Sequence, residues 1–158
     1  MINRIQNLYI WLKSNIAYVT AIFVLQWLIL EIIISQVCIV LTTSNSVPYK
    51  ICLQLYNVKP KKGDLCAFIY KGEKFIKYLS GQAGDRITNS NDEIFIGHNR
   101  VGKAYSTCKL TPIKAQTVPK GYVFVSGNHT YSFDSRYQEF GFIKDEDIQG
   151  KVIGLVKY

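Results

Sequence analysis

The chain has 158 residues, of which 48% are hydrophobic and 19% are charged, and its net charge is +8. This composition excludes an intrinsically disordered chain and predicts one folded domain with appendages. The basic residues form only one dense block, Lys59-Pro60-Lys61-Lys62, and are otherwise scattered. The charge therefore favours a solvated basic surface, and we expect no nucleic-acid partner.

Residues 15–36 form the first predicted element. They contain no Lys, Arg or Asp, and their apolar run is long enough to cross a bilayer. A cleaved signal peptide would have a shorter apolar part followed by an Ala-x-Ala site, and no such site follows here. A core helix of so small a domain would not be apolar on all sides. We therefore predict a transmembrane anchor at 15–36, preceded by a short N-terminal segment, residues 1–14.

The charges that flank this anchor predict its orientation. Arg4 and Lys13 precede it, whereas residues 42–49 after it are uncharged. The positive-inside rule therefore places residues 1–14 in the cytoplasm and residues 37–158 outside. Glu31 is interpreted as lying among the outer headgroups, with a contact to another membrane protein as the alternative.

After the anchor the pattern changes to β-branched and aromatic runs. Turn signals such as Lys62-Gly63-Asp64 and Lys71-Gly72-Glu73 separate them. The expected strands cover residues 37–41, 51–56, 65–70, 75–79, 93–96, 121–126 and 151–156. The fold class predicted for 37–158 is mostly β, a small antiparallel β-domain.

The four cysteines are Cys38, Cys52, Cys66 and Cys108. None forms a CxxC pair and the two histidines have no zinc-ligand spacing, so we expect no metal. Cys38 falls in an apolar run, where cysteine acts as a small hydrophobe. The other three either include one disulfide or are free thiols, and the sequence does not choose between these.

Candidate chemistry lies in three short motifs, of which the first is Thr43-Ser44-Asn45-Ser46-Val47-Pro48. Pro48 fixes the chain and biases Val47 toward an extended conformation. Such a segment could present a serine hydroxyl at the edge of a sheet. The alternative is a polar turn just outside the membrane.

The second motif covers residues 75–87 and contains Lys77 between Ile76 and Tyr78. A lysine against apolar surface has a depressed pKa and can be neutral near pH 7, and plausible neighbours are Phe75, Tyr78 and Leu79. A neutral lysine can take a proton from a serine hydroxyl. The alternative is a strand lysine whose amine reaches water.

The third motif covers residues 123–137 and places Ser132, Asp134 and Arg136 at a spacing of two. In an extended segment these side chains share one face. Asp134 and Arg136 could then pair, and Ser132 could hydrogen-bond a nearby group. A surface loop is the alternative.

Together, and in this order, the motifs resemble those of the signal peptidase I family. That family has a serine followed closely by proline after a transmembrane anchor, then a lysine motif, then a motif that ends Ser-x-Asp-x-Arg-Tyr. The matching residues here are Ser46, Pro48, Ile76-Lys77, Gly81, Gly84-Asp85, Ile87 and residues 132–137. The resemblance covers nearly all of residues 37–158.

The resemblance implies a membrane-bound serine endopeptidase with a dyad of Ser46 as nucleophile and Lys77 as general base. Its substrates would be exported precursor proteins, cleaved in the periplasm at the outer face of a bacterial cytoplasmic membrane. Cleavage would follow small residues, and no cofactor is implied. The resemblance gives supporting roles to further residues: oxyanion stabilisation to Ser44, orientation of the lysine amine to Ser132, and support of that segment to Asp134 and Arg136.

Departures from the family pattern bear on the branch. The Ser-x-Pro spacing resembles the TraF-type branch, which matures pilin precursors for conjugative transfer. Lys50 stands where that branch usually has glycine, and Gly127-Asn128-His129 replaces Gly-Asp-Asn.

Two other functions compete with the peptidase. LexA-like repressors also use a Ser–Lys dyad, but the anchor and the lack of a helix-turn-helix argue against them. A membrane-tethered β-module that binds a secretion-system partner is the non-catalytic alternative, in which Ser46 and Lys77 are incidental.

Overall fold

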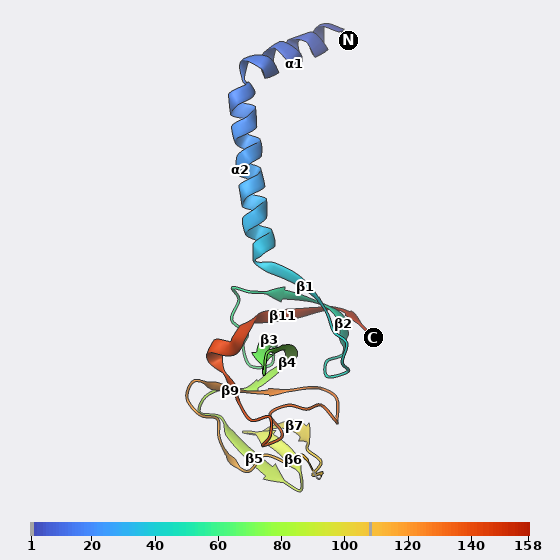
Figure 1. Ribbon diagram of the computed structural model, residues 1–158, viewed down its shortest axis with the longest axis vertical. Coiled ribbons are helices and arrows are strands. Elements are labelled where there is room, and N and C mark those ends of the chain that lie inside the picture. The colour runs from blue at the N-terminus through green and yellow to red at the C-terminus, as the bar shows by residue number, and fades with distance from the viewer. Residues whose placement is uncertain (1, 108) are drawn as a thin grey trace. The chain divides into compact units, whose positions relative to one another are not determined.

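The computed structural model describes residues 2–107 and 109–158. The chain divides into two units, of which the first ends at Gln36 and the second is Val37–Tyr158. Helices α1 (Ile2–Ser14) and α2 (Ile16–Ser35) form the first unit, and the strands belong to the second (Figure 1).

Helix α2 lies within the predicted anchor. Its 20 residues are apolar enough to cross a membrane, and none of its side chains is buried within the protein. Helix α1 was not predicted, because its polar residues interrupt the apolar ones and it has no acidic residue in its first turn to mark a helix start.

The second unit is built from two antiparallel sheets, which confirms the predicted fold class. The larger sheet has the order β1 (Val37–Leu41), β2 (Tyr49–Leu55), β11 (Ile148–Lys157), β3 (Leu65–Tyr70), β4 (Glu73–Gly81), β9 (Tyr122–Ser126) and β10 (Ile143–Lys144). The smaller sheet has the order β7 (Asn99–Lys103), β6 (Glu93–Ile96), β5 (Arg86–Ser90) and β8 (Gln116–Thr117). A short 3₁₀ helix, Asp145–Asp147, leads into β11.

Strands β1, β3 and β6 have the predicted bounds, whereas β5, β7, β8 and β10 were not predicted. The missed strands are short or rich in polar residues, so they carry no apolar alternation. Strand β5 instead forms a hairpin with β6 across Asn91 and Asp92, which both have positive φ angles, of 53° and 65°. Turns of this kind suit the twist of a hairpin.

Side chains of β4 alternate between two packed clusters, and this alternation sets the surroundings of Lys77. Phe75 and Leu79 pack in a cluster with Cys66 and Val125. Tyr78 packs instead in the cluster on the opposite face of the strand. By strand alternation Lys77 shares the face of Phe75 and Leu79, whereas Tyr78, the third expected neighbour, points to the opposite face.

The outward face of β1, β2 and β11 is apolar. Ile39 lies opposite Leu53, which in turn lies opposite Ile153. Ile39 and Leu41 are 67% and 68% exposed. The outer face of an antiparallel sheet is usually polar, so this face is an unusual exposed apolar patch.

Cys52 and Cys66 are buried free thiols, and Cys38 is a partly buried one. Burial raises the pKa of Cys66 to about 12. As free thiols, Cys52 and Cys66 do not pair with one another. A disulfide that involves Cys108, the other predicted possibility, lies outside the described residues.

Candidate active site

Ser46 lies in the loop between β1 and β2, and its neighbours fix its position. Val47 is 1% exposed and packs in the cluster that includes Cys52 and Ala67. The carbonyl oxygen of Ser46 accepts a hydrogen bond of 2.7 Å from the backbone N–H of Asn128. The loop is thus held by packing on one side of Ser46 and by the segment after β9 on the other.

Lys77 lies on β4 and reaches this loop with its amine. Its Nζ donates to Ser46 Oγ at 2.6 Å and to Ser132 Oγ at 2.5 Å. The two hydroxyl oxygens are 3.3 Å apart. The three side chains therefore form a closed hydrogen-bonded triangle, although they come from three distant parts of the chain.

Burial of Lys77, which is only 2% exposed, lowers its pKa from 10.5 to about 8. The negative charge of Asp134 opposes this shift, and the positive charge of Arg136 adds to it. Among the described residues no carboxylate forms an ion pair with Lys77. A substantial fraction of the amine is therefore neutral near pH 8, and a neutral amine can accept a proton.

Asp134 and Arg136 form a buried ion pair behind the triangle. Their side chains are 0% and 2% exposed, and Arg136 Nη2 lies 2.9 Å from Asp134 Oδ2. Asp134 also accepts a 2.8 Å hydrogen bond from the backbone N–H of Gly127. Residues 127–136 run through turns and bends and not through a strand, so the loop alternative describes the backbone here. The pair forms across these turns.

Arg136 also ties the loop of the third motif to the smaller sheet. Its guanidinium donates to the carbonyl oxygens of Lys103, His129 and Ser132. Five donors in a rigid fork suit such multiple contacts. The backbone that carries Ser132 is therefore fixed by a buried charge.

Two residues support the triangle in ways that the sequence does not indicate. A Cβ on Gly127 would lie 2.2 Å from Ser132 Oγ and 2.9 Å from the carbonyl oxygen of Ser46, so only glycine fits there. Phe133 packs edge-on against Phe140 with 5.0 Å between ring centroids, which anchors the residue next to Ser132 in the core. Their roles depend on contacts distant in sequence, which no local pattern reports.

Ser44 is exposed and lies outside the triangle. It lines a cavity of about 350 Å³ together with Val47, Phe75 and Ile76. Residues 73–77 of β4 pair with β3 on one side and, within the described parts of the chain, with no strand on the other. An unpaired strand edge thus borders this cavity, whose lining includes Val47 and Ile76, the chain neighbours of Ser46 and Lys77, but neither Ser46 nor Lys77.

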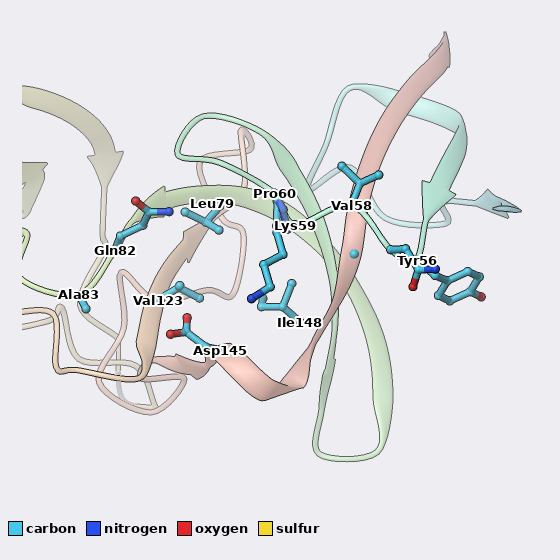
Figure 2. Close-up of a pocket in the computed structure, with 12 residues that line it drawn as sticks. Tyr56, Val58, Lys59, Pro60, Leu79, Gln82, Ala83, Val123, Asp145 and Ile148 are labelled. Carbon is cyan, nitrogen blue, oxygen red and sulfur yellow. The ribbon is translucent and has the colours of Figure 1, made fainter. Parts of the chain in front are cut away.

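A larger cavity, of about 560 Å³, contains none of the predicted site residues. Figure 2 shows Leu79, Val123 and Ile148 in its wall, with the charged ends of Lys59 and Asp145 also at the cavity. Within residues 2–107 and 109–158, no group of three or more His, Cys, Asp or Glu side chains is placed to hold a metal ion.

Comparison with known proteins places this geometry in context. The family model described as "Signal peptidase, peptidase S26" matches residues 11–156. Signal peptidase I of Bacillus caldolyticus is 32% identical over 115 residues, which cover 61% of this chain and 62% of that relative. The crystal structure of a signal peptidase I from Enterococcus faecalis V583 matches with 27% identity and a TM-score of 0.43, over 59% of this chain and 96% of that one. The match thus spans less than two thirds of the curated relative.

Proposed function

Because the chain belongs to the signal peptidase family, peptidase S26, we propose that it is a membrane-bound serine endopeptidase that removes signal peptides from exported precursors. Ser46 is the nucleophile and Lys77 the general base. The observation that carries the proposal is the 2.6 Å contact between Lys77 Nζ and Ser46 Oγ at a buried amine with a lowered pKa. Cleavage of a labelled precursor by the full chain in lipid vesicles tests it.

In the proposed mechanism the amine of Lys77 carries out every proton transfer. Neutral Lys77 takes the proton from Ser46 Oγ as that oxygen attacks the scissile carbonyl. The resulting ammonium gives this proton to the departing amine, which leaves an acyl ester on Ser46. Neutral Lys77 then activates a water molecule that hydrolyses the ester. Ser132 orients the amine, and the Ser44 hydroxyl with a backbone N–H stabilises the oxyanion.

The substrate is proposed to bind as an extended strand along the unpaired edge of β4. Its backbone would pair with residues 73–77, which within the described parts of the chain pair with no strand on that side. Its side chains would enter the cavity lined by Ser44, Val47, Phe75 and Ile76. A cavity of about 350 Å³ could hold a side chain of any size, so the proposed preference for small residues next to the scissile bond rests on the family and not on this volume.

A membrane setting has support from both units. Helix α2 is long and apolar enough to span a bilayer. The exposed apolar patch on β1, β2 and β11 would gain free energy by contact with lipid. We place the second unit in the periplasm, at the outer face of a bacterial cytoplasmic membrane, because Arg4 and Lys13 precede the span and would stay in the cytoplasm.

The Ser46-Val47-Pro48 spacing supports the TraF-type branch and hence maturation of a conjugative pilin. A general signal peptidase is the alternative within the family. Cleavage of a pilin precursor in preference to a general secretory precursor would favour the first. A membrane-tethered binding module without catalysis would need neither the buried amine nor its two hydroxyl partners, so we rank it lower.

The first prediction concerns Gly127→Ala. The added methyl group would overlap Ser132 Oγ and press on the backbone of Ser46. Displacing a catalytic group by about 1 Å can cost about 10²-fold in rate, and we expect a loss of that order in the rate of precursor cleavage. Gly97→Ala is the control, because its Cβ would meet open space at an exposed turn, so any loss there comes from backbone strain at a φ of 60° and not from steric overlap. Equal rates in the two variants would contradict the packing around Ser132.

The second prediction concerns pH. The cleavage rate should rise about tenfold per pH unit below the pKa of Lys77 and level off above about 8, because only the neutral amine accepts a proton. His129 lies outside the triangle, and its Nδ1 accepts a hydrogen bond from the backbone N–H of Tyr131. The variant His129→Ala should keep the same profile. A midpoint near 6.5 that disappears in this variant would show that a histidine is the base.

A further inference from the structure

Helix α1 has one apolar face that nothing in the described chain covers. Ile5, Leu8, Tyr9 and Leu12 recur at helical spacing, and they are 65%, 57%, 64% and 37% exposed. The remaining positions carry Arg4, Lys13 and uncharged polar residues, together with Ile10, which is apolar and 64% exposed but lies off this face. The first acidic residue of the chain is Glu31, so α1 is a purely cationic amphipathic helix.

The length of α2 excludes α1 from the membrane core. At 1.5 Å per residue, the 20 residues of α2 extend about 30 Å, which is the thickness of the hydrocarbon region. If α1 and α2 formed one straight helix, Arg4, Gln6 and Asn7 would lie either far beyond one side of the bilayer or inside its hydrocarbon region. Since α2 alone completes the span, the C-terminal end of α1 lies at the headgroups.

The junction at Asn15 allows α1 to leave the direction of α2. Asn15 has φ of −115° and ψ of 17°, which interrupts the helix. Its side-chain Nδ2 donates to the carbonyl oxygen of Trp11 at 2.8 Å, and Ser14 Oγ donates to the same oxygen at 2.9 Å. These bonds satisfy the end of α1, so the two helices are separate elements within the first unit, as Figure 1 shows.

We propose that α1 is an interfacial helix that lies flat on an anionic phospholipid surface, on the side of the bilayer where α2 begins. Its apolar face enters the boundary between headgroups and acyl chains, and Arg4 and Lys13 contact lipid phosphates. Trp11 borders the apolar face, where an indole suits the interface. This surface is distinct from the proposed peptidase site and functions whether or not the chain cleaves precursors.

The test uses the two tryptophans of the full chain, reconstituted in vesicles that contain phosphatidylglycerol. Trp27→Phe leaves Trp11 as the sole indole, and Trp11→Phe leaves Trp27, near the middle of α2. Lipids brominated near the headgroup end of the acyl chain should quench Trp11 best, whereas lipids brominated near the methyl end should quench Trp27 best. Exposure of Trp11 to aqueous acrylamide without lipid quenching, or deep quenching of both residues, would overturn the proposal.

Two further variants, both in the Trp27→Phe background, test the two parts of the surface. Leu8→Asn with Leu12→Asn should raise acrylamide quenching of Trp11 severalfold, because the apolar face is lost. Arg4→Gln with Lys13→Gln should raise the acrylamide quenching of Trp11 less. The expected level is that of the Trp27→Phe protein in vesicles of phosphatidylcholine alone. Asn7→Gln on the polar face is the control and should change nothing. Unchanged protection of Trp11 in the Leu8 and Leu12 variant would refute lipid contact by this face.

Discussion

Replacement of Lys77 by arginine should abolish precursor cleavage as completely as replacement by alanine. A guanidinium keeps its positive charge near neutral pH and cannot accept the serine proton, even where it fits the site. Loss of a general base costs about 10²–10⁴-fold in rate. The loss should appear in single-turnover cleavage with enzyme in excess, which separates chemistry from substrate binding.

Lys144→Arg is the control for this prediction. Lys144 lies on β10, away from the proposed substrate edge, and its exposed amine pairs with Glu146 at 3.0 Å. We expect this variant to cleave at close to the wild-type rate. If Lys77→Arg were as active as Lys144→Arg, the proton would be taken by another group and the dyad would be wrong.

Asp134→Ala should lower stability more than removal of any surface carboxylate. It would leave the guanidinium of Arg136 buried without a counter-ion, and breaking a buried pair in this way costs about 3–5 kcal/mol. It would also remove the acceptor for the N–H of Gly127. The expected result is a melting temperature lower by about 10 °C, measured by circular dichroism on the full chain in detergent.

The control for this measurement is Asp85→Ala. Asp85 pairs with Lys62 at 2.7 Å, but both side chains are about a third exposed. Exposed pairs of this kind contribute about 0–1 kcal/mol, so the melting temperature should hardly change. Asp134→Asn keeps the shape and one acceptor, and we expect an intermediate loss. Equal destabilisation by Asp134→Ala and Asp85→Ala would contradict a structural role for the buried pair.

Much of the larger sheet could be predicted from the sequence, because its central strands carry the signals that periodicity detects. Strand β3 is a run of apolar and β-branched residues between turn signals, and its bounds were predicted as observed. Strands β5 and β7 were missed because polar residues dominate them. They are strands only because β6 lies between them and supplies their hydrogen bonds.

The candidate site was predictable where a single residue type in its local sequence indicates the chemistry. A lysine amid apolar neighbours predicts a lowered pKa, and burial indeed lowers the pKa of Lys77. The alternation of side chains along β4 puts Tyr78 on the opposite face from Lys77, and this too could have been predicted from the sequence. The turns of the third motif were not predictable, because they are held by contacts of Arg136 with the distant Lys103. The steric need for Gly127 likewise depends on Ser46, which lies far away in the chain.

The most direct test of the account is cleavage of a labelled exported precursor by the full chain in lipid vesicles, comparing wild type with Ser46→Ala. Ser90→Ala is the matched control, since Ser90 is an exposed serine in the smaller sheet. The account predicts processed product with wild type and with Ser90→Ala, and none above the uncatalysed background with Ser46→Ala. Processing at the wild-type rate by Ser46→Ala would contradict the assignment of Ser46 as nucleophile and, with it, the proposed mechanism.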